Sequence, residues 1–140
     1  MSTFPQPDDP ESIRTDHRDL DGLFGRFLEA ASAGSLAAAV EAIGVFDDAL
    51  RFHTRMEESL FPPGQAEKLV AAPGETPADA LFRELRLEHV QIRELSGMIR
   101  RVLGESADLS AARALAGSLA QRWDAHTARE EREWLGPLSS

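Results

Sequence analysis

The chain has 140 residues, of which 42% are hydrophobic and 28% are charged, so it can form one folded domain around a single core. Its net charge of −9 argues against binding to nucleic acids or anionic membranes, because both require a basic surface. The sequence contains no cysteine and no tyrosine, which excludes disulfides, thiolate metal sites, thiol catalysis and phenolate ligands. It shows no apolar run of transmembrane length and no signal-peptide pattern, so we expect a cytoplasmic protein.

The first half of the chain predicts two helices. Apolar residues recur in steps of three and four over about residues 10–33, after Asp9 as a capping residue and before Gly34. The same spacing returns after Ser35, a suitable N-cap, and continues to the Pro-Pro-Gly break at residues 62–64.

The second half predicts two more helices. The third begins after Thr76, with Pro77 in its first turn, and ends near Gly104. The fourth follows Asp108 and runs to about Trp134. The longer connection between the halves is expected to hold a helical turn around residues 66–71.

Short connections after the first and third helices make neighbouring helices antiparallel. Strand patterns are almost absent. We therefore predict an all-α, up-down-up-down four-helix bundle that forms one domain over residues 9–137, with residues 1–8 as a disordered tail.

The two halves repeat one pattern, so each is predicted to be a helical hairpin. An acidic residue and a histidine open the pattern, and a histidine followed by two glutamates at the fourth and fifth positions closes it. The members are Asp16, His17, His53, Glu57 and Glu58 in the first half, and Glu88, His89, His126, Glu130 and Glu131 in the second.

All four histidines fall on the predicted core-facing stripes. The midpoint between His17 and His53 is residue 35, and the midpoint between His89 and His126 lies between residues 107 and 108. Both midpoints are predicted turns, and antiparallel partners at equal distances from a turn lie at the same level. Four imidazoles are therefore predicted to meet in one layer.

Glu57 and Glu130 stand four residues after a histidine, so they share its face of the helix. Two buried carboxylates need partners. Either the histidines hydrogen-bond them as ordinary core groups, or all six side chains bind metal. Six ligands are too many for one tetrahedral zinc but suit one octahedral ion or, as we prefer, two ions bridged by the carboxylates. Ligands without sulfur fit iron, manganese or zinc.

These motifs resemble the hemerythrin-like (HHE cation-binding) family over nearly the whole chain. The resemblance implies a non-haem di-iron centre with an oxo or hydroxo bridge, for which zinc or manganese could substitute. The predicted metal ligands are His17, His53, Glu57, His89, His126 and Glu130.

Two positions depart from the oxygen-carrying hemerythrins that the sequence resembles. Those carriers place a histidine where this chain has Arg93, and their last carboxylate stands where it has Glu131. We expect Arg93 either to extend along Ile92 to solvent or to pair with Glu57, Glu130 or an anion. We expect Glu58 and Glu131 to point into solvent, with Glu131 a reserve ligand. Asp16 and Glu88 are expected to be surface charges or, alternatively, to support the metal-binding histidines from behind.

The resemblance therefore implies a protein that binds or senses oxygen, nitric oxide or peroxide rather than one that carries oxygen reversibly. An enzyme that decomposes hydrogen peroxide or reduces nitric oxide is one alternative, and a structural bundle stabilised by metal is another. The expected partner is a small diatomic molecule or peroxide, and the sequence leaves the oligomeric state open.

Overall fold

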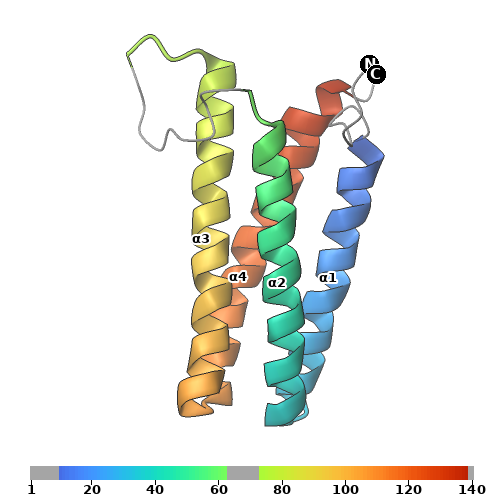
Figure 1. Cartoon of the computed structure of the whole chain (residues 1–140), viewed down its shortest axis with the longest axis vertical. Helices are drawn as coiled ribbons and strands as arrows, with labels where there is room; N and C mark the ends of the chain where they lie inside the picture. Colours follow the sequence, from blue (N-terminus) through green and yellow to red (C-terminus); the bar gives the residue numbers. More distant parts are fainter. Residues whose placement is uncertain (1–9, 63–72, 139–140) are drawn as a thin grey trace.

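The computed structural model describes residues 10–62 and 73–138. Four long helices follow one another as α1 (Pro10–Ser32), α2 (Leu36–Leu60), α3 (Pro77–Ser106) and α4 (Leu109–Arg129). A π-helix, η1 (Glu130–Leu135), and a 3-10 turn, η2 (Gly136–Leu138), continue α4. Neighbouring helices run in opposite directions (Figure 1), which confirms the predicted all-α four-helix bundle.

The predicted capping residues inside the described ranges act as N-caps. The hydroxyl of Ser35 accepts a hydrogen bond from the backbone N–H of Ala38, and Thr76 forms a capping box with Asp79. The carboxylate of Asp108 accepts from the backbone N–H of Ala111. Polar side chains at these positions satisfy the free N–H groups of a helix start, which explains the agreement.

The two connections turn in different ways. Gly34 ends the first helix with a φ of 74°, a conformation that favours glycine. The third helix passes Gly104 and ends at Ser106, where Ala107 takes the left-handed conformation with a φ of 50°. The predicted end at Gly104 is therefore two residues early. The expected tail at residues 1–8, the cap at Asp9 and the helical turn at residues 66–71 lie outside the described residues.

The fourth helix differs from the prediction of one α-helix to Trp134. The backbone N–H of Glu130 donates to the carbonyls of both His126 and Thr127, and the chain continues in the wider π-helical form. Trp134 and Leu135 are both buried there. A π-turn adds a residue per turn, and the apolar spacing alone does not distinguish it from an α-helix.

The core consists of two apolar clusters separated along the bundle. The larger cluster includes Leu20, Leu50, Ile92 and Trp123, and the smaller one consists of Ile13, Phe61, Leu85, Trp134 and Leu135. Along each long helix and the residues that directly follow it, the histidine lies between a residue of one cluster and a residue of the other. The histidine layer therefore divides the core. None of the described helices is long and apolar enough to span a membrane.

Candidate metal centre

The four histidines form one buried layer, as the midpoints predict. Ring centroids lie 5.0 Å apart for His17 and His53 and 4.6 Å apart for His89 and His126. None of the four is more than 4% exposed. Each hairpin thus contributes one pair of imidazoles.

Glu57 divides its two oxygens between these pairs. Its Oε2 lies 2.9 Å from Nε2 of His53 and 3.1 Å from Nε2 of His17. Its Oε1 lies 2.9 Å from Nε2 of His89, which belongs to the other pair.

Glu130 does the same from the other hairpin. Its Oε1 lies 3.1 Å from Nε2 of His17, and its Oε2 lies 3.1 Å from Nε2 of both His89 and His126. Both carboxylates are fully buried. Two groups of donors result, and within each group the ligand atoms lie within 4.8 Å of one another. The first group consists of His17, His53, Glu57 and Glu130, and the second of Glu57, His89, His126 and Glu130.

Several buried donor atoms in these groups lie near a possible partner, but their geometry does not form a hydrogen bond. They are both ring nitrogens of His53, Nε2 of His126, Oε1 of Glu57 and Oε1 of Glu130. A buried polar atom without a partner destabilises a fold by about 1–3 kcal/mol. Cations bound among these nitrogen and oxygen atoms would satisfy them, so the donor set fits metal ions.

A family model, described as the hemerythrin HHE cation-binding domain, matches residues 8–138. The chain belongs to this family. Searches of curated proteins and of solved structures find no match. Cation binding by the family agrees with the buried histidine and glutamate groups of this HHE domain.

The carboxylates set the protonation of the HHE layer when metal is absent. Burial by itself lowers the pKa of His17, but hydrogen bonds and charge from Glu130 and Glu57 outweigh it and raise this pKa to about 10. The same opposition, with the carboxylates again dominant, raises the pKa of His89 and His126. A cation that binds here must displace these protons.

Each hairpin also places one carboxylate next to Nδ1 of a histidine from the other hairpin. Glu58 of α2 lies 2.8 Å from Nδ1 of His89 on α3, and Glu131 of η1 lies 2.8 Å from Nδ1 of His17 on α1. The expectation that Glu58 and Glu131 point into solvent is wrong. They lie about 140° around the helix from the preceding histidine, and in this bundle that direction faces the adjacent helix.

Asp16 and Glu88 complete the set within each hairpin. Glu88 Oε1 lies 2.7 Å from Nδ1 of His126, and Asp16 Oδ2 lies 3.5 Å from Nδ1 of His53. The expectation of surface charges is therefore wrong for Glu88, and Asp16 is half-exposed but directed at a histidine. Carboxylates on Nδ1 fix the ring orientation and leave Nε2 free for a metal. Their repetition in both halves of the sequence was the signal that could have revealed them.

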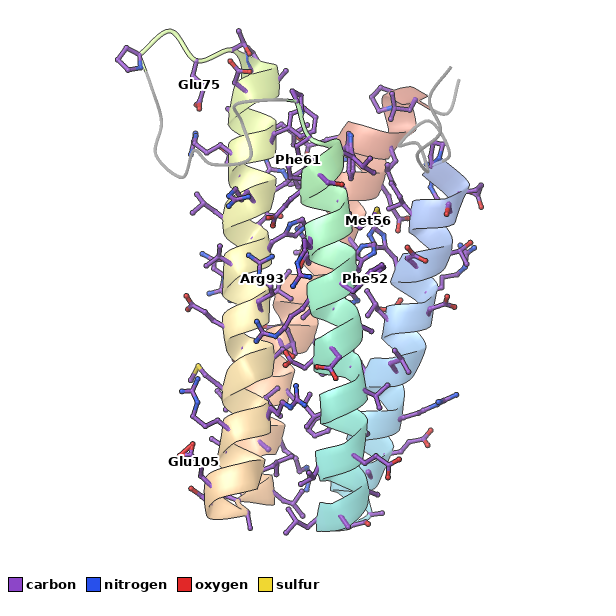
Figure 2. The ribbon with its side chains drawn as sticks, viewed as in Figure 1. Phe52, Met56, Phe61, Glu75, Arg93 and Glu105 are labelled. Atoms are coloured by element: carbon purple, nitrogen blue, oxygen red, sulfur yellow. The ribbon has the colours of Figure 1, made fainter. Side chains whose placement is uncertain are left out.

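Arginines hold the carboxylates behind only one histidine pair. Glu58 accepts from Arg86 at 2.8 Å and from Arg93 at 3.1 Å. Glu88 accepts from Arg129 at 2.8 Å. Neither expectation for Arg93 is met, because its guanidinium pairs with Glu58 and not with Glu57 or Glu130. It also donates to the hydroxyl of Thr54 at 2.9 Å and so lies between α2 and α3 (Figure 2).

Two aromatic side chains also touch the histidine layer. The ring of Phe61 stacks on His89, with centroids 6.0 Å apart, and Trp123 meets His17 edge-on at 5.7 Å. The indole N–H of Trp123 donates to Asp21 on α1. The HHE layer therefore has apolar walls, which favour small ligands over large polar ones.

Proposed function

We propose that this HHE domain is a non-haem di-iron protein that binds or senses oxygen, nitric oxide or peroxide. The observation that carries the proposal is the division of both carboxylates between the two histidine pairs. A carboxylate that serves a single ion has no need to direct its second oxygen to a second set of imidazoles. Glu57 and Glu130 both do so.

In this proposal His17 and His53 hold one ion, His89 and His126 hold the other, and Glu57 and Glu130 bridge them. Iron supplies one-electron redox chemistry and accepts nitrogen and oxygen ligands. Two imidazoles and two carboxylate oxygens for each ion leave positions for a bridging oxygen and for a small exogenous ligand.

The surroundings of the layer support binding or sensing rather than reversible carriage. Arg93 occupies the position at which the resembling carriers provide a further histidine, and its guanidinium is engaged by Glu58 and Thr54. A guanidinium stays protonated at ordinary pH and does not coordinate metal. One ion thus has fewer protein ligands than in those carriers, which favours fast oxidation over a stable oxygen complex.

The test combines metal analysis with rapid mixing. Protein produced in iron-rich medium is expected to contain two irons per chain. The reduced protein is expected to react with oxygen and with nitric oxide in stopped-flow absorbance. Zinc in place of iron would support a structural bundle instead. Sustained turnover of excess peroxide or nitric oxide would support an enzyme, and a stable, reversible oxygen complex would contradict the proposal.

A further inference from the structure

Two surface grooves reach the histidine layer from opposite hairpins. The α1–α2 groove has a volume of about 290 Å³, and its lining includes Asp16, Asp19, Phe52 and His53. The α3–α4 groove has a volume of about 330 Å³, and its lining includes Arg122, Arg129, Arg132 and His126. Each groove therefore touches one histidine of a different donor group.

The two grooves carry opposite charge. Asp16 and Asp19 are the charged residues of the described lining of the α1–α2 groove, which contains no arginine or lysine. The α3–α4 groove is lined by three arginines and one carboxylate, Glu88, which already accepts hydrogen bonds from His126 and Arg129. A divalent cation is attracted to the first groove and repelled by the second.

His53, at the inner end of the α1–α2 groove, is the least constrained of the four histidines. It is only 4% exposed, its Nε2 faces Oε2 of Glu57 at 2.9 Å, and its Nδ1 has no hydrogen-bond partner in the described structure. The other three rings each have a carboxylate oxygen within 2.8 Å of Nδ1. Asp16 remains 3.5 Å away from Nδ1 of His53. A cation in this groove thus meets an imidazole whose Nδ1 is not held by a short contact, unlike that of the other three rings.

The position formed by His89 and His126 is more rigidly held. Arg86 and Arg93 fix the carboxylate behind His89, and Arg129 fixes the carboxylate behind His126. The described structure shows no arginine bonded to Asp16 or Glu131, and both side chains are more than a third exposed. The two metal positions therefore differ in access and in anchoring.

We propose that the α1–α2 groove is the route by which divalent metal enters and leaves this domain. Asp16 and Asp19 collect the cation, His53 is its first buried ligand, and the His17–His53 position exchanges faster than the His89–His126 position. The inference rests on the proposed function, because it supplies the metal route of the same centre.

Asp19 is suited to a test because it is exposed and lies outside the donor groups. Glu105 provides a matched control. It is also exposed, and Figure 2 shows it near the lower end of α3, well below Phe52. D19K and E105K change the net charge by the same amount, so a difference between them reports the local field of the groove.

The experiment measures Co²⁺ uptake by metal-free protein in stopped-flow absorbance at low ionic strength. D19K is expected to slow the second-order uptake rate at least about fivefold relative to E105K, with D19N intermediate. The gap is expected to shrink in 0.5 M salt, where the Debye length is only a few ångströms, roughly 4 Å. The final number of Co²⁺ ions per chain is expected to stay unchanged, which shows that the variant is folded.

A variant of the other groove and a release measurement complete the test. R122E is expected to leave the uptake rate unchanged, and an EDTA chase is expected to show one fast and one slow Co²⁺ ion. Equal uptake rates for D19K and E105K, or faster uptake by R122E, would overturn the route while the proposed function stands. Failure of the unmodified protein to bind Co²⁺, Fe²⁺ or Zn²⁺ would overturn both.

Discussion

Glu57 and Glu130 each give one carboxylate oxygen to the His17 side of the layer and the other to the His89 side. They come from different hairpins, and no part of either carboxylate is exposed. Burial and repulsion from Glu130 both raise the pKa of Glu57, yet the imidazoles of His17, His53 and His89 around its oxygens outweigh these effects and lower it. Each carboxylate therefore stays charged and joins the two halves of the site.

Replacing Glu57 or Glu130 by glutamine is expected to weaken binding of both ions, not of one. Glutamine keeps the shape but has one neutral oxygen in place of two that share a negative charge. Titration of Fe²⁺ into each metal-free variant measures this. The matched variant Glu131→Gln should keep two ions, and loss of binding in that variant alone would make Glu131 the fourth-helix ligand.

Glu58 is expected to tune affinity without changing stoichiometry. Glu58→Gln removes the charge behind Nδ1 of His89 but leaves the Nε2 donor in place, so affinity should fall by about 10- to 100-fold with both ions still bound. Competition with a chelator measures the change. Glu94→Gln, an exposed replacement on α3, the helix of His89, is the control and should match the unmodified protein. An unchanged affinity in Glu58→Gln would refute the role of Glu58.

The metal-free fold is expected to weaken as the pH rises. The pKa of His17 is raised from 6.5 to about 10, so its charged ring stabilises the fold fully below pH 6.5. This contribution is lost as the pH rises through about 10. The urea midpoint of the protein in EDTA should therefore fall between pH 6.5 and 9.5, whereas Co²⁺ affinity should rise over the same range. A midpoint that rises with pH would contradict the charged layer.

Asp47 stabilises the bundle independently of the metal centre. This buried carboxylate between α2 and α3 accepts from Ser96 at 2.7 Å and from Arg51 and Arg100 at 3.1 Å each. Asp47→Ala should lower the free energy of unfolding by about 2 kcal/mol, because it removes the carboxylate that pairs with the buried hydroxyl of Ser96 and with two arginines. Urea unfolding of the metal-free variant measures the loss. Asp48→Asn, which changes an exposed partner of Arg100, should cost less than about 0.5 kcal/mol.

The helices, their caps and the six central donors could be predicted because each depends on spacing along a single helix. His53 and Glu57 share a face whatever their neighbours are, and the turn positions set the level of each histidine. The π-helix that begins at Glu130 could not be predicted, because the spacing of its apolar residues does not distinguish it from an α-helix. Its start depends on a backbone N–H shared between two carbonyls.

The partners of Nδ1 were missed because they depend on contacts between helices. Glu58 reaches His89 and Glu131 reaches His17 across the hairpin boundary, and helical spacing describes only the face from which each side chain leaves. The position of Arg93 follows from the same contact, because it is bonded to Glu58. The acidic residues repeat in both halves of the sequence, but the repeat predicts their histidine partners only when the packing of the helices is known.

Because the histidine layer divides the core, the two ends of the metal-free bundle do not unfold as one cooperative unit. The small cluster of Ile13, Phe61, Leu85, Trp134 and Leu135 is joined to the larger cluster through a layer of polar groups. Without a cation, few apolar contacts connect the two clusters across that layer. The end with the small cluster can therefore open as a separate unit. Amide hydrogen exchange should then be fast in η1 and the first turns of α1 and α3. Metal binding would make the two units unfold as one.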